Sequence, residues 1–254
     1  MAALSGLILD IDGTPLVGGS AVPGAPEILV RCARLGIPYR LVTNTTRRSR
    51  ASTAAALRAA GLAVEDALVL QPAVLARRMI VDSGRLRTGL LVPDEVREDL
   101  AGIEEDRSAP ELVVVGDLGR GIGFEPLNEA FRWLRGGARL LALHKNPFWQ
   151  PSPQDGWVLD AGAFVAALEY AAGVTADVVG KPSPEFFRLA LRDMKLEPQQ
   201  VLVVGDDVVN DDRGAAAVGC RTALVKTGKF TGLETEVAGF KPDVVVDSVA
   251  QLEL

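Results

Sequence analysis

The chain contains a single histidine, His144, and two cysteines, Cys32 and Cys220, among its 254 residues. One histidine excludes a multi-histidine metal site, and two cysteines exclude a disulfide framework, so we expect a cytoplasmic protein. The sequence also lacks the G-x-x-x-x-G-K-[ST], G-x-G-x-x-G and G-x-S-x-G patterns of nucleotide-binding proteins and serine hydrolases. The glycine-rich stretch at 116–123 has the wrong spacing for a dinucleotide site, and we interpret it as a loop.

The sequence also lacks long apolar runs, and its acidic residues outnumber its basic ones. No apolar run approaches the roughly 18 residues that a membrane helix needs, and the N-terminus lacks the basic start and apolar core of a signal peptide. The net charge is −6, and the lysines and arginines are scattered along the chain. The sequence therefore argues against a membrane or nucleic acid as the main partner.

What the chain does have is an alternation of short apolar runs with segments of helical periodicity. The expected strands lie at 7–11, 37–44, 67–70, 201–207, 221–228 and 242–247. Helices are expected at 25–36 and 47–61, and the first of these places Ile28, Leu29, Cys32 and Leu35 on one face. Continuous Val and Leu runs separated by helices predict an α/β fold built on a Rossmann-like, doubly wound parallel sheet.

The middle of the chain reads as a second, smaller α/β unit. Strands are expected at 89–92, 111–115 and 138–143, and helices at 126–137 and 161–173. We place this insert at 83–175, between two parts of a catalytic core at 1–82 and 176–254.

The first polar cluster, "DIDGT", ends an apolar strand with Asp10 and Asp12. Side chains two apart on an extended chain point the same way, so both carboxylates can face one site. They could bind a hard cation or divide the roles of nucleophile and acid/base. An ordinary Asp-Gly turn is the alternative when this stretch is taken alone.

Three further polar clusters also stand at strand ends. "LVTNTT" offers Thr43 and Asn44 for an anion, with Thr45 or Thr46 as a cap for the next helix. "VVGKPSPEFF" places Lys181 before a helix start marked by Ser183 and Pro184, where an ammonium can neutralise phosphate oxygens.

The last cluster, "VLVVGDDVVNDD", crowds four carboxylates that repel one another unless a cation lies among them. They belong to Asp206, Asp207, Asp211 and Asp212. Ligands bind beyond the carboxyl ends of the strands in a doubly wound sheet, so we expect all four clusters to meet there. Taken alone, the alternatives are plain capping for the second cluster and a surface lysine for the third. For the fourth, acidic residues at a helix N-terminus account for Asp211 and Asp212 better than for Asp206.

The order of the clusters, Asp-x-Asp-Gly-Thr, Thr-Asn, Gly-Lys-Pro and Gly-Asp-Asp-x(3)-Asp, resembles the haloacid dehalogenase (HAD) superfamily of phosphatases over nearly the whole chain. The insert resembles the α/β cap of class IIA, the NagD-type or p-nitrophenyl-phosphatase-like subfamily. The stretches "VVGKPSPEFF" and "VTNTT" are most similar to the branch that contains the phospholysine phosphohistidine inorganic pyrophosphate phosphatases.

The resemblance implies a Mg²⁺-dependent phosphatase that works through an aspartyl-phosphate. It implies that Asp10 is the nucleophile and that Asp12 is the general acid/base. The implied metal ligands are Asp10, Asp206 and the backbone carbonyl of Asp12, with Asp211 as a supporting carboxylate. The implied phosphate-binding residues are Thr43, Asn44 and Lys181.

Other functions remain open at this stage. A phospho-receiver has acidic residues, Thr and Lys around Mg²⁺, but the large insert and the Asp-x-Asp spacing argue against it. A dehalogenase needs neither Asp12 nor the fourth cluster, and a non-catalytic phosphate-binding module would be expected to have lost a catalytic position.

The substrate is expected to be a small phosphorylated molecule, chosen by a cap that closes over the site. Sugar phosphates, nucleotides, phosphoglycolate-like metabolites and phosphoamino acids all fit. Substrate contacts are expected from a cap loop that contains His144, Lys145, Asn146, Phe148 and Trp149. For the two aromatic residues, packing in the cap core or a homodimer contact through the cap is an equal alternative.

Overall fold

The computed structural model describes residues 4–84, 86–149, 156–230, 232 and 239–253. The chain divides into two compact units. The core unit comprises residues 1–43, 51–70 and 181–254, and the inserted unit comprises 44–50 and 71–180. The inserted unit is thus larger than the expected 83–175, because it also takes in residues 71–82, 176–180 and a short segment after Thr43.

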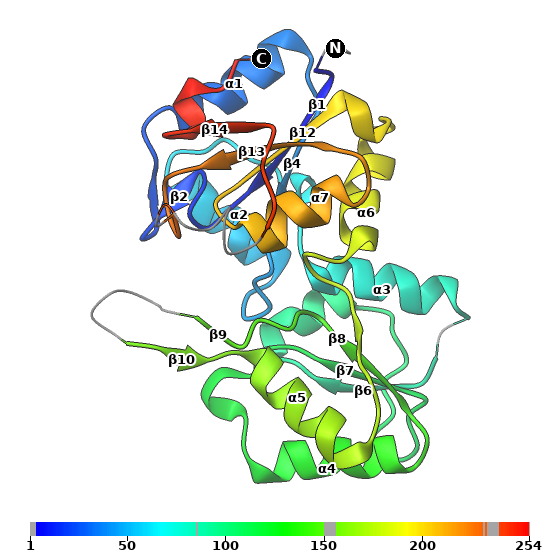
Figure 1. The fold of residues 1–254 in the computed structure, drawn as a ribbon. Coiled ribbons are helices and arrows are strands. Elements are labelled where there is room, and N and C mark those ends of the chain that lie inside the picture. The colour runs from blue at the N-terminus through cyan, green and yellow to red at the C-terminus, as the bar shows by residue number, and fades with distance from the viewer. Residues whose placement is uncertain (1–3, 85, 150–155, 231, 233–238, 254) are drawn as a thin grey trace. The chain divides into compact units, whose positions relative to one another are not determined.

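The core unit is built on a parallel six-stranded sheet with the order β14-β13-β12-β1-β4-β5 (Figure 1). Its strands are β1 (Gly6–Asp10), β4 (Tyr39–Val42), β5 (Val69–Leu70), β12 (Val201–Gly205), β13 (Arg221–Val225) and β14 (Val244–Val246). The chain runs outward in one direction after β1 and in the other after β12. The topological switch therefore lies between these two strands, which pair with Leu9 opposite Val204.

Helices cover the core sheet because its strands are apolar on both faces. They are α1 (Ala25–Leu35), α2 (Arg50–Ala59), α6 (Pro184–Met194) and the short α7 (Gly214–Ala216). Leu7 and Leu9 pack with buried residues of α1 and α2, and Ile8 points to the opposite face. The predicted doubly wound sheet is confirmed.

Helix α1 buries all but one of the residues that the helical periodicity predicts to be buried. Ile28, Leu29 and Cys32 are buried as predicted, and Gly36 ends the helix in the left-handed region with φ 67°. Leu35 was expected on the same face but is 50% exposed. It is the last residue of the helix and lies at the edge of the apolar stripe.

Short elements complete the core unit. They are the antiparallel pair β2 (Leu16–Val17) and β3 (Ser20–Ala21), the 3-10 turns Asp66–Leu68, Pro198–Gln200 and Val249–Gln251, and a π-helical turn at Val208–Arg213. Cys32 and Cys220 are buried free thiols.

The inserted unit has its own parallel sheet with the order β11-β8-β7-β6. Its strands are β6 (Thr88–Leu91), β7 (Leu112–Val115), β8 (Arg139–Ala142) and β11 (Asp177–Val178), and its helices are α3 (Pro72–Asp82), α4 (Phe124–Arg135) and α5 (Ala161–Ala172). Helices α4 and α5 pack together against one face of this sheet, and α3 lies on its other side (Figure 1). The unit also has 3-10 turns at Asp94–Leu100 and Gly119–Gly121, and an antiparallel pair, β9 (Phe148–Trp149) with β10 (Val158–Leu159).

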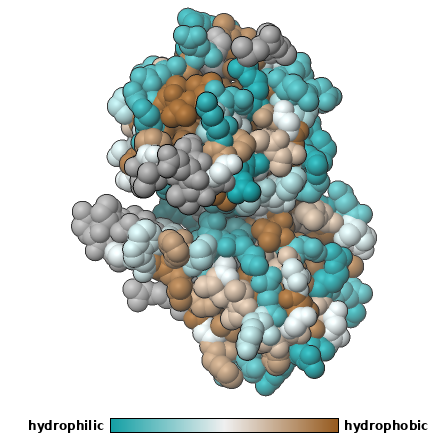
Figure 2. Space-filling view, in the orientation of Figure 1, coloured by the Kyte–Doolittle hydropathy of each residue, from teal (hydrophilic) through white to brown (hydrophobic). Residues whose placement is uncertain are grey.

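The surface of each unit mixes polar and apolar residues. On the face shown in Figure 2, hydrophobic residues form separate groups among hydrophilic ones. Scattered exposed apolar side chains are normal for a folded protein surface. In the part of the chain that is described, no helix is long and apolar enough to cross a membrane.

The fully buried Phe186 tests the packing of α6. It meets Phe187 edge to face, with ring centroids 6.3 Å apart. Phe186→Ala should lower the free energy of unfolding of the core unit by about 3–5 kcal/mol, because it removes a buried ring and leaves a cavity. The exposed Val30 is the control, and Val30→Ala should change stability by less than about 0.5 kcal/mol. Equal effects of the two changes in chemical denaturation would contradict this packing.

Candidate active site

Asp10 ends the central strand β1 at the topological switch of the core sheet. Its side chain is buried, and its residue is only 5% exposed. The carboxylate accepts a hydrogen bond from the Lys181 ammonium, with 2.5 Å between Oδ1 and Nζ. The apolar strand β1 therefore ends on a buried carboxylate that is paired with a lysine.

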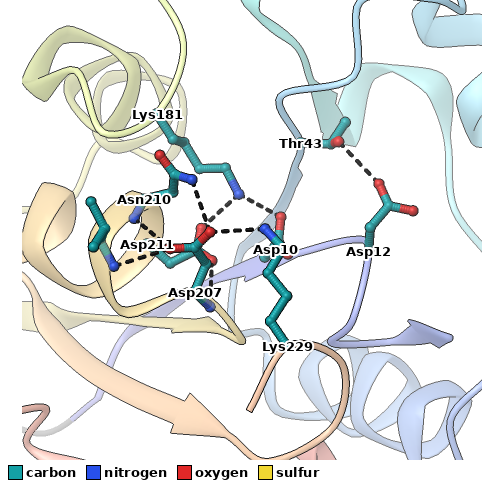
Figure 3. A network of polar contacts seen from close by, with 9 residues as sticks. Asp10, Asp12, Thr43, Lys181, Asp207, Asn210, Asp211 and Lys229 are labelled. Atoms are coloured by element: carbon teal, nitrogen blue, oxygen red, sulfur yellow. Dashed lines mark hydrogen bonds and ion pairs between the residues drawn. The ribbon is translucent and has the colours of Figure 1, made fainter. Parts of the chain in front are cut away.

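Lys181 pairs with two acidic residues, Asp10 and Asp211. Its Nζ also donates to Oδ1 of Asp211 at 2.6 Å, and Figure 3 shows the ammonium between the two carboxylates. Asp211 comes from the π-helical turn after β12, and Lys181 comes directly before α6. The Ser183 and Pro184 signal for that helix is confirmed, with Ser183 as the residue before the first turn.

Asp206 follows β12, and the backbone at Gly13 and Gly228 approaches its carboxylate closely. A Cβ on Gly13 would lie 2.0 Å from Oδ2 of Asp206, and one on Gly228 would lie 2.2 Å from it. Both glycines have positive φ values, 92° and 81°, so an L side chain there meets backbone strain as well as the steric clash. The Oδ2 atom accepts the backbone N–H of Lys229 at 2.9 Å.

The second oxygen of Asp206 indicates a cation site. Oδ1 is buried and has no hydrogen-bond partner among the described residues. Asp10, Asp206 and Asp211 each offer a carboxylate oxygen, and these oxygens lie within 4.8 Å of one another. Three buried carboxylates and an unpartnered oxygen fit a hard divalent cation, which prefers oxygen ligands.

Asp12 lies apart from that group of oxygens. Its carboxylate is exposed and accepts a hydrogen bond from the Thr43 hydroxyl, with 3.3 Å between Oγ1 and Oδ2. Figure 3 shows the Asp12 side chain directed toward Thr43, while Asp10 is directed toward Lys181. Asp10 and Asp12 thus have different surroundings, as two different chemical roles would require.

Burial dominates the electrostatics of the site. It raises the pKa of Asp10 to about 7, against the opposing effect of Lys181. Burial and the neighbouring carboxylates raise the pKa of Asp206 to about 6 and that of Asp211 to about 7. Burial disfavours the Lys181 ammonium, but Asp10 and Asp211 more than offset this and raise its pKa. A buried, permanently charged lysine therefore faces carboxylates that need a further cation to stay ionised together.

The other two aspartates of the fourth cluster have different surroundings. Oδ1 of Asp207 accepts the backbone N–H groups of Val209 and Asn210, and its Oδ2 accepts Lys229 Nζ at 2.8 Å. These partners outweigh burial and lower the pKa of Asp207 to about 2. Asp212 is buried with both oxygens unpartnered among the described residues, and burial raises its pKa to about 8.

Two of the predicted phosphate-binding residues, Thr43 and Asn44, are consecutive in the sequence but belong to different units. Thr43 belongs to the core unit, where its N–H donates to the Leu70 carbonyl at 3.2 Å, and Asn44 belongs to the inserted unit. The prediction that Thr45 or Thr46 caps the next helix is wrong, because α2 begins only at Arg50. The Thr46 hydroxyl instead accepts the N–H of Asp117.

Sequence reasoning missed the loop after β13. Thr227 donates its hydroxyl to the Gly13 carbonyl at 2.6 Å, and Lys229 contacts Asp206 and Asp207. The signal was present, because "ALVKTGKF" also ends a strand of the same sheet with polar residues and glycine. In the sequence alone, one lysine after a strand does not mark a functional site, because its contacts are not visible there.

The fold and the site together define a Rossmann-like hydrolase with an inserted α/β unit. Residues 7–104 match the family model "Haloacid dehalogenase-like hydrolase", and residues 178–252 match the HAD-hydrolase-like model. The chain is 37% identical to the phospholysine phosphohistidine inorganic pyrophosphate phosphatase of Bos taurus, over 99% of this chain and 93% of the relative. It is also 37% identical to the haloacid dehalogenase-like hydrolase domain-containing protein 2 of Homo sapiens, over 97% and 93%.

Solved structures agree. The p-nitrophenyl phosphatase from Archaeoglobus fulgidus superposes with a TM-score of 0.91 at 32% identity, covering 97% of both chains. NagD from E. coli K-12 superposes with a TM-score of 0.91 at 26% identity, covering 99% of both. The chain belongs to the haloacid dehalogenase-like hydrolase family, and it is a phosphatase of the NagD and p-nitrophenylphosphatase type.

The raised pKa values predict how stability depends on pH. Asp10, Asp206 and Asp211 titrate near 6 to 7 when folded and near 3.8 when unfolded, so the folded state holds more protons between these values. Stability should therefore fall as pH rises. Without divalent cations, the melting temperature should drop by about 5 °C or more from pH 6 to pH 8, at about 2–4 °C per kcal/mol.

Added Mg²⁺ should restore most of that loss at pH 8 and less at pH 6, because protons compete with the cation for the carboxylates. The Asp206→Asn variant should show a weaker Mg²⁺ effect at both pH values. A melting temperature that rises with pH in chelator would contradict the electrostatics described for this site.

Proposed function

We propose that the chain is a Mg²⁺-dependent phosphatase that hydrolyses a phosphate monoester or phosphoamide through an aspartyl-phosphate on Asp10. The observation that carries this proposal is the position of Asp10, buried at the carboxyl end of β1 and held by Lys181. An anionic phosphate can approach a carboxylate only where positive charge cancels their repulsion. Lys181 supplies part of that charge.

Asp10, Asp206 and the backbone carbonyl of Asp12 would hold Mg²⁺, and Asp211 lies close enough to join them. When bound, the ion neutralises phosphate oxygens and the developing negative charge of the transfer. The three clustered carboxylates and the unpartnered Oδ1 of Asp206 support this assignment.

In the first half-reaction, a carboxylate oxygen of Asp10 attacks phosphorus. The bond from phosphorus to the leaving group breaks, and the leaving oxygen or nitrogen takes the electron pair and a proton from Asp12. In the second, the Asp12 carboxylate takes a proton from water, whose oxygen attacks phosphorus and releases phosphate and the Asp10 carboxylate. The exposed carboxylate of Asp12 suits proton exchange, and its hydrogen bond to Thr43 holds it in place.

Thr43, Asn44 and Lys181 are proposed to bind the phosphate. Thr43 offers a hydroxyl, Asn44 an amide and Lys181 an ammonium already held between two carboxylates. Thr43 follows β4 and Lys181 precedes α6, both in the core unit that carries Asp10.

The core unit is proposed as the catalytic domain and the inserted unit as the cap that selects a small phosphorylated substrate. One relative is named as a phospholysine, phosphohistidine and inorganic pyrophosphate phosphatase, and one solved structure is named as a p-nitrophenyl phosphatase, which supports a small phosphorylated substrate. Phe148 is half-exposed in β9, as a homodimer contact through the cap would require. We also propose a cytoplasmic location.

The phospho-receiver alternative is not favoured, because a relative and a solved structure similar to this chain are named as phosphatases.

Two aspartate variants test the proposed roles. Asp10→Asn should abolish turnover of p-nitrophenyl phosphate, because an amide is not a useful nucleophile. In Asp12→Asn, p-nitrophenolate still leaves readily without a proton, but hydrolysis of the aspartyl-phosphate loses its base and slows by about 10²–10⁴-fold. Stopped-flow traces of Asp12→Asn should therefore show a burst near one equivalent per site, followed by a slow steady rate.

Sustained turnover by the wild type, rather than stoichiometric labelling, separates a phosphatase from a receiver. Asp207→Asn is the matched control, since Asp207 caps the π-helical turn and lies outside the clustered oxygens. It should keep turnover without a burst. Activity in Asp10→Asn, or a burst in Asp207→Asn but none in Asp12→Asn, would contradict the assignment.

A further inference from the structure

The segment 44–50 follows directly after Thr43 but is part of the inserted unit. The chain reaches the inserted unit at Asn44, leaves it after Arg50, and returns at Gln71. The contacts of this segment show how it is held.

Thr46 is the most deeply held residue of the segment. Its hydroxyl oxygen accepts the N–H of Asp117 at 3.0 Å and lies 3.1 Å from Nε2 of His144. Thr46 and His144 are each only 2% exposed. The Asn146 N–H donates to Nδ1 of the imidazole, so Nε2 carries the proton and donates to Thr46.

The charge state of His144 agrees with this assignment. Burial lowers its pKa to about 4, so the imidazole is neutral at physiological pH. Thr46 thus receives two buried hydrogen bonds, from the loops that follow β7 and β8. Removing the hydroxyl would take away the acceptor of the buried Asp117 N–H, and would leave Nε2 of His144 with only Asp160 Oδ1, 3.6 Å away.

Arg47 adds an ion pair to Asp117, in the loop that follows β7. Its Nε donates to Oδ2 of Asp117, and the guanidinium lies 4.4 Å from the centroid of the Trp149 ring. Asp117 thus binds the segment twice, through its backbone N–H and through its carboxylate.

The rest of the segment is also anchored to the inserted unit. Gln71 Nε2 donates to the carbonyls of Thr45 and Arg48, each at 3.2 Å. The N–H of Ser49 donates to Glu95 at 3.1 Å, and that of Arg50 donates to Asp99 at 2.7 Å. Every residue from 45 to 50 therefore has a bond to a partner in the inserted unit.

Asn44 itself lies against the inserted unit. A Cβ on Gly180 would come 2.5 Å from Oδ1 of Asn44 and 2.6 Å from the Leu143 carbonyl oxygen. Gly180 is fixed there by its own N–H, which donates to the same Leu143 carbonyl at 2.8 Å. The Asn44 amide thus packs closely against backbone that a larger residue at 180 would displace.

We propose that the segment 44–50 is a positioning element through which the inserted unit controls phosphate binding by Asn44, with Thr46 as its main positioning residue. Thr43 stays bonded to Leu70 of the core strand β5, and the next residue, Asn44, packs against Gly180 of the inserted unit. His144 and Asp117 hold Thr46 in place, which gives the single histidine a positioning role rather than a substrate contact. The inference rests on the proposed function only in assigning phosphate to Asn44.

The experiment compares Thr46→Val with Thr46→Ser and Thr88→Val. Thr88 is the matched control: it is fully buried in the same unit, its hydroxyl donates one hydrogen bond to the Leu86 carbonyl at 2.7 Å, and it begins β6 away from the segment. Inorganic phosphate is titrated as a competitive inhibitor of p-nitrophenyl phosphate hydrolysis. Amide hydrogen exchange of peptides covering 44–50 is measured by mass spectrometry.

Thr46→Val should weaken inhibition by phosphate and raise KM by about 10-fold, the factor that corresponds to losing about one buried hydrogen bond. It should also speed amide exchange across 44–50. Thr46→Ser should restore both to near wild-type values, and Thr88→Val should change neither by more than about 2-fold.

Equal effects of Thr46→Val and Thr88→Val on phosphate inhibition would overturn the inference, as would unchanged exchange across 44–50 in Thr46→Val. Wild-type protein that does not hydrolyse p-nitrophenyl phosphate would contradict the proposed function instead, and the exchange comparison would still decide whether Thr46 anchors the segment.

Discussion

The structure depends on one buried cation, the Lys181 ammonium, held between Asp10 and Asp211. Removing a lone carboxylate from water is costly, and the parallel sheet buries several of them at one strand end. Lys181 pairs with two of them, and Oδ1 of Asp206 has no hydrogen-bond partner in the described part of the chain. The remaining excess of negative charge fits a divalent cation, and that cation together with the Lys181 ammonium would attract a phosphate. The proposed cation binding and the proposed phosphate binding would thus both follow from a single electrostatic imbalance.

Backbone geometry makes that imbalance possible. Because Gly13 and Gly228 have no side chains, their main chain can approach the Asp206 carboxylate closely. A Cβ at either position would clash with Oδ2 of Asp206. The pairing of β1 with β12 brings Asp10 and Asp206 to the same edge of the sheet, although 195 residues separate them in the sequence. In the inserted unit, the loops after β7 and β8 hold the segment that follows Thr43. The clustered carboxylates thus belong to the core unit, while polar contacts within the inserted unit hold the segment that begins at Asn44.

Much of this could be predicted from the sequence, because strand ends are marked by apolar runs that stop at polar residues. The central strands, the helix stop at Gly36 and the four clusters followed from local pattern. The capping role given to Thr45 or Thr46 failed because a threonine before a helix looks the same whether it caps that helix or bonds a distant loop. Likewise, the grouping of Asp211 rather than the Asp12 side chain with Asp10 and Asp206 depends on side-chain direction, which spacing does not fix. The helix at Pro72–Asp82 and its place in the inserted unit also depend on long-range packing.

The central claim is that Asp10 takes the phosphoryl group, and the stereochemical course at phosphorus tests it most directly. A chiral, isotopically labelled p-nitrophenyl phosphorothioate would be hydrolysed in labelled water and the configuration of the released thiophosphate determined. Each in-line displacement inverts phosphorus, so attack by Asp10 followed by attack of water gives net retention. The account predicts retention. Net inversion would show that water attacks the substrate directly, and would contradict a nucleophilic role for Asp10.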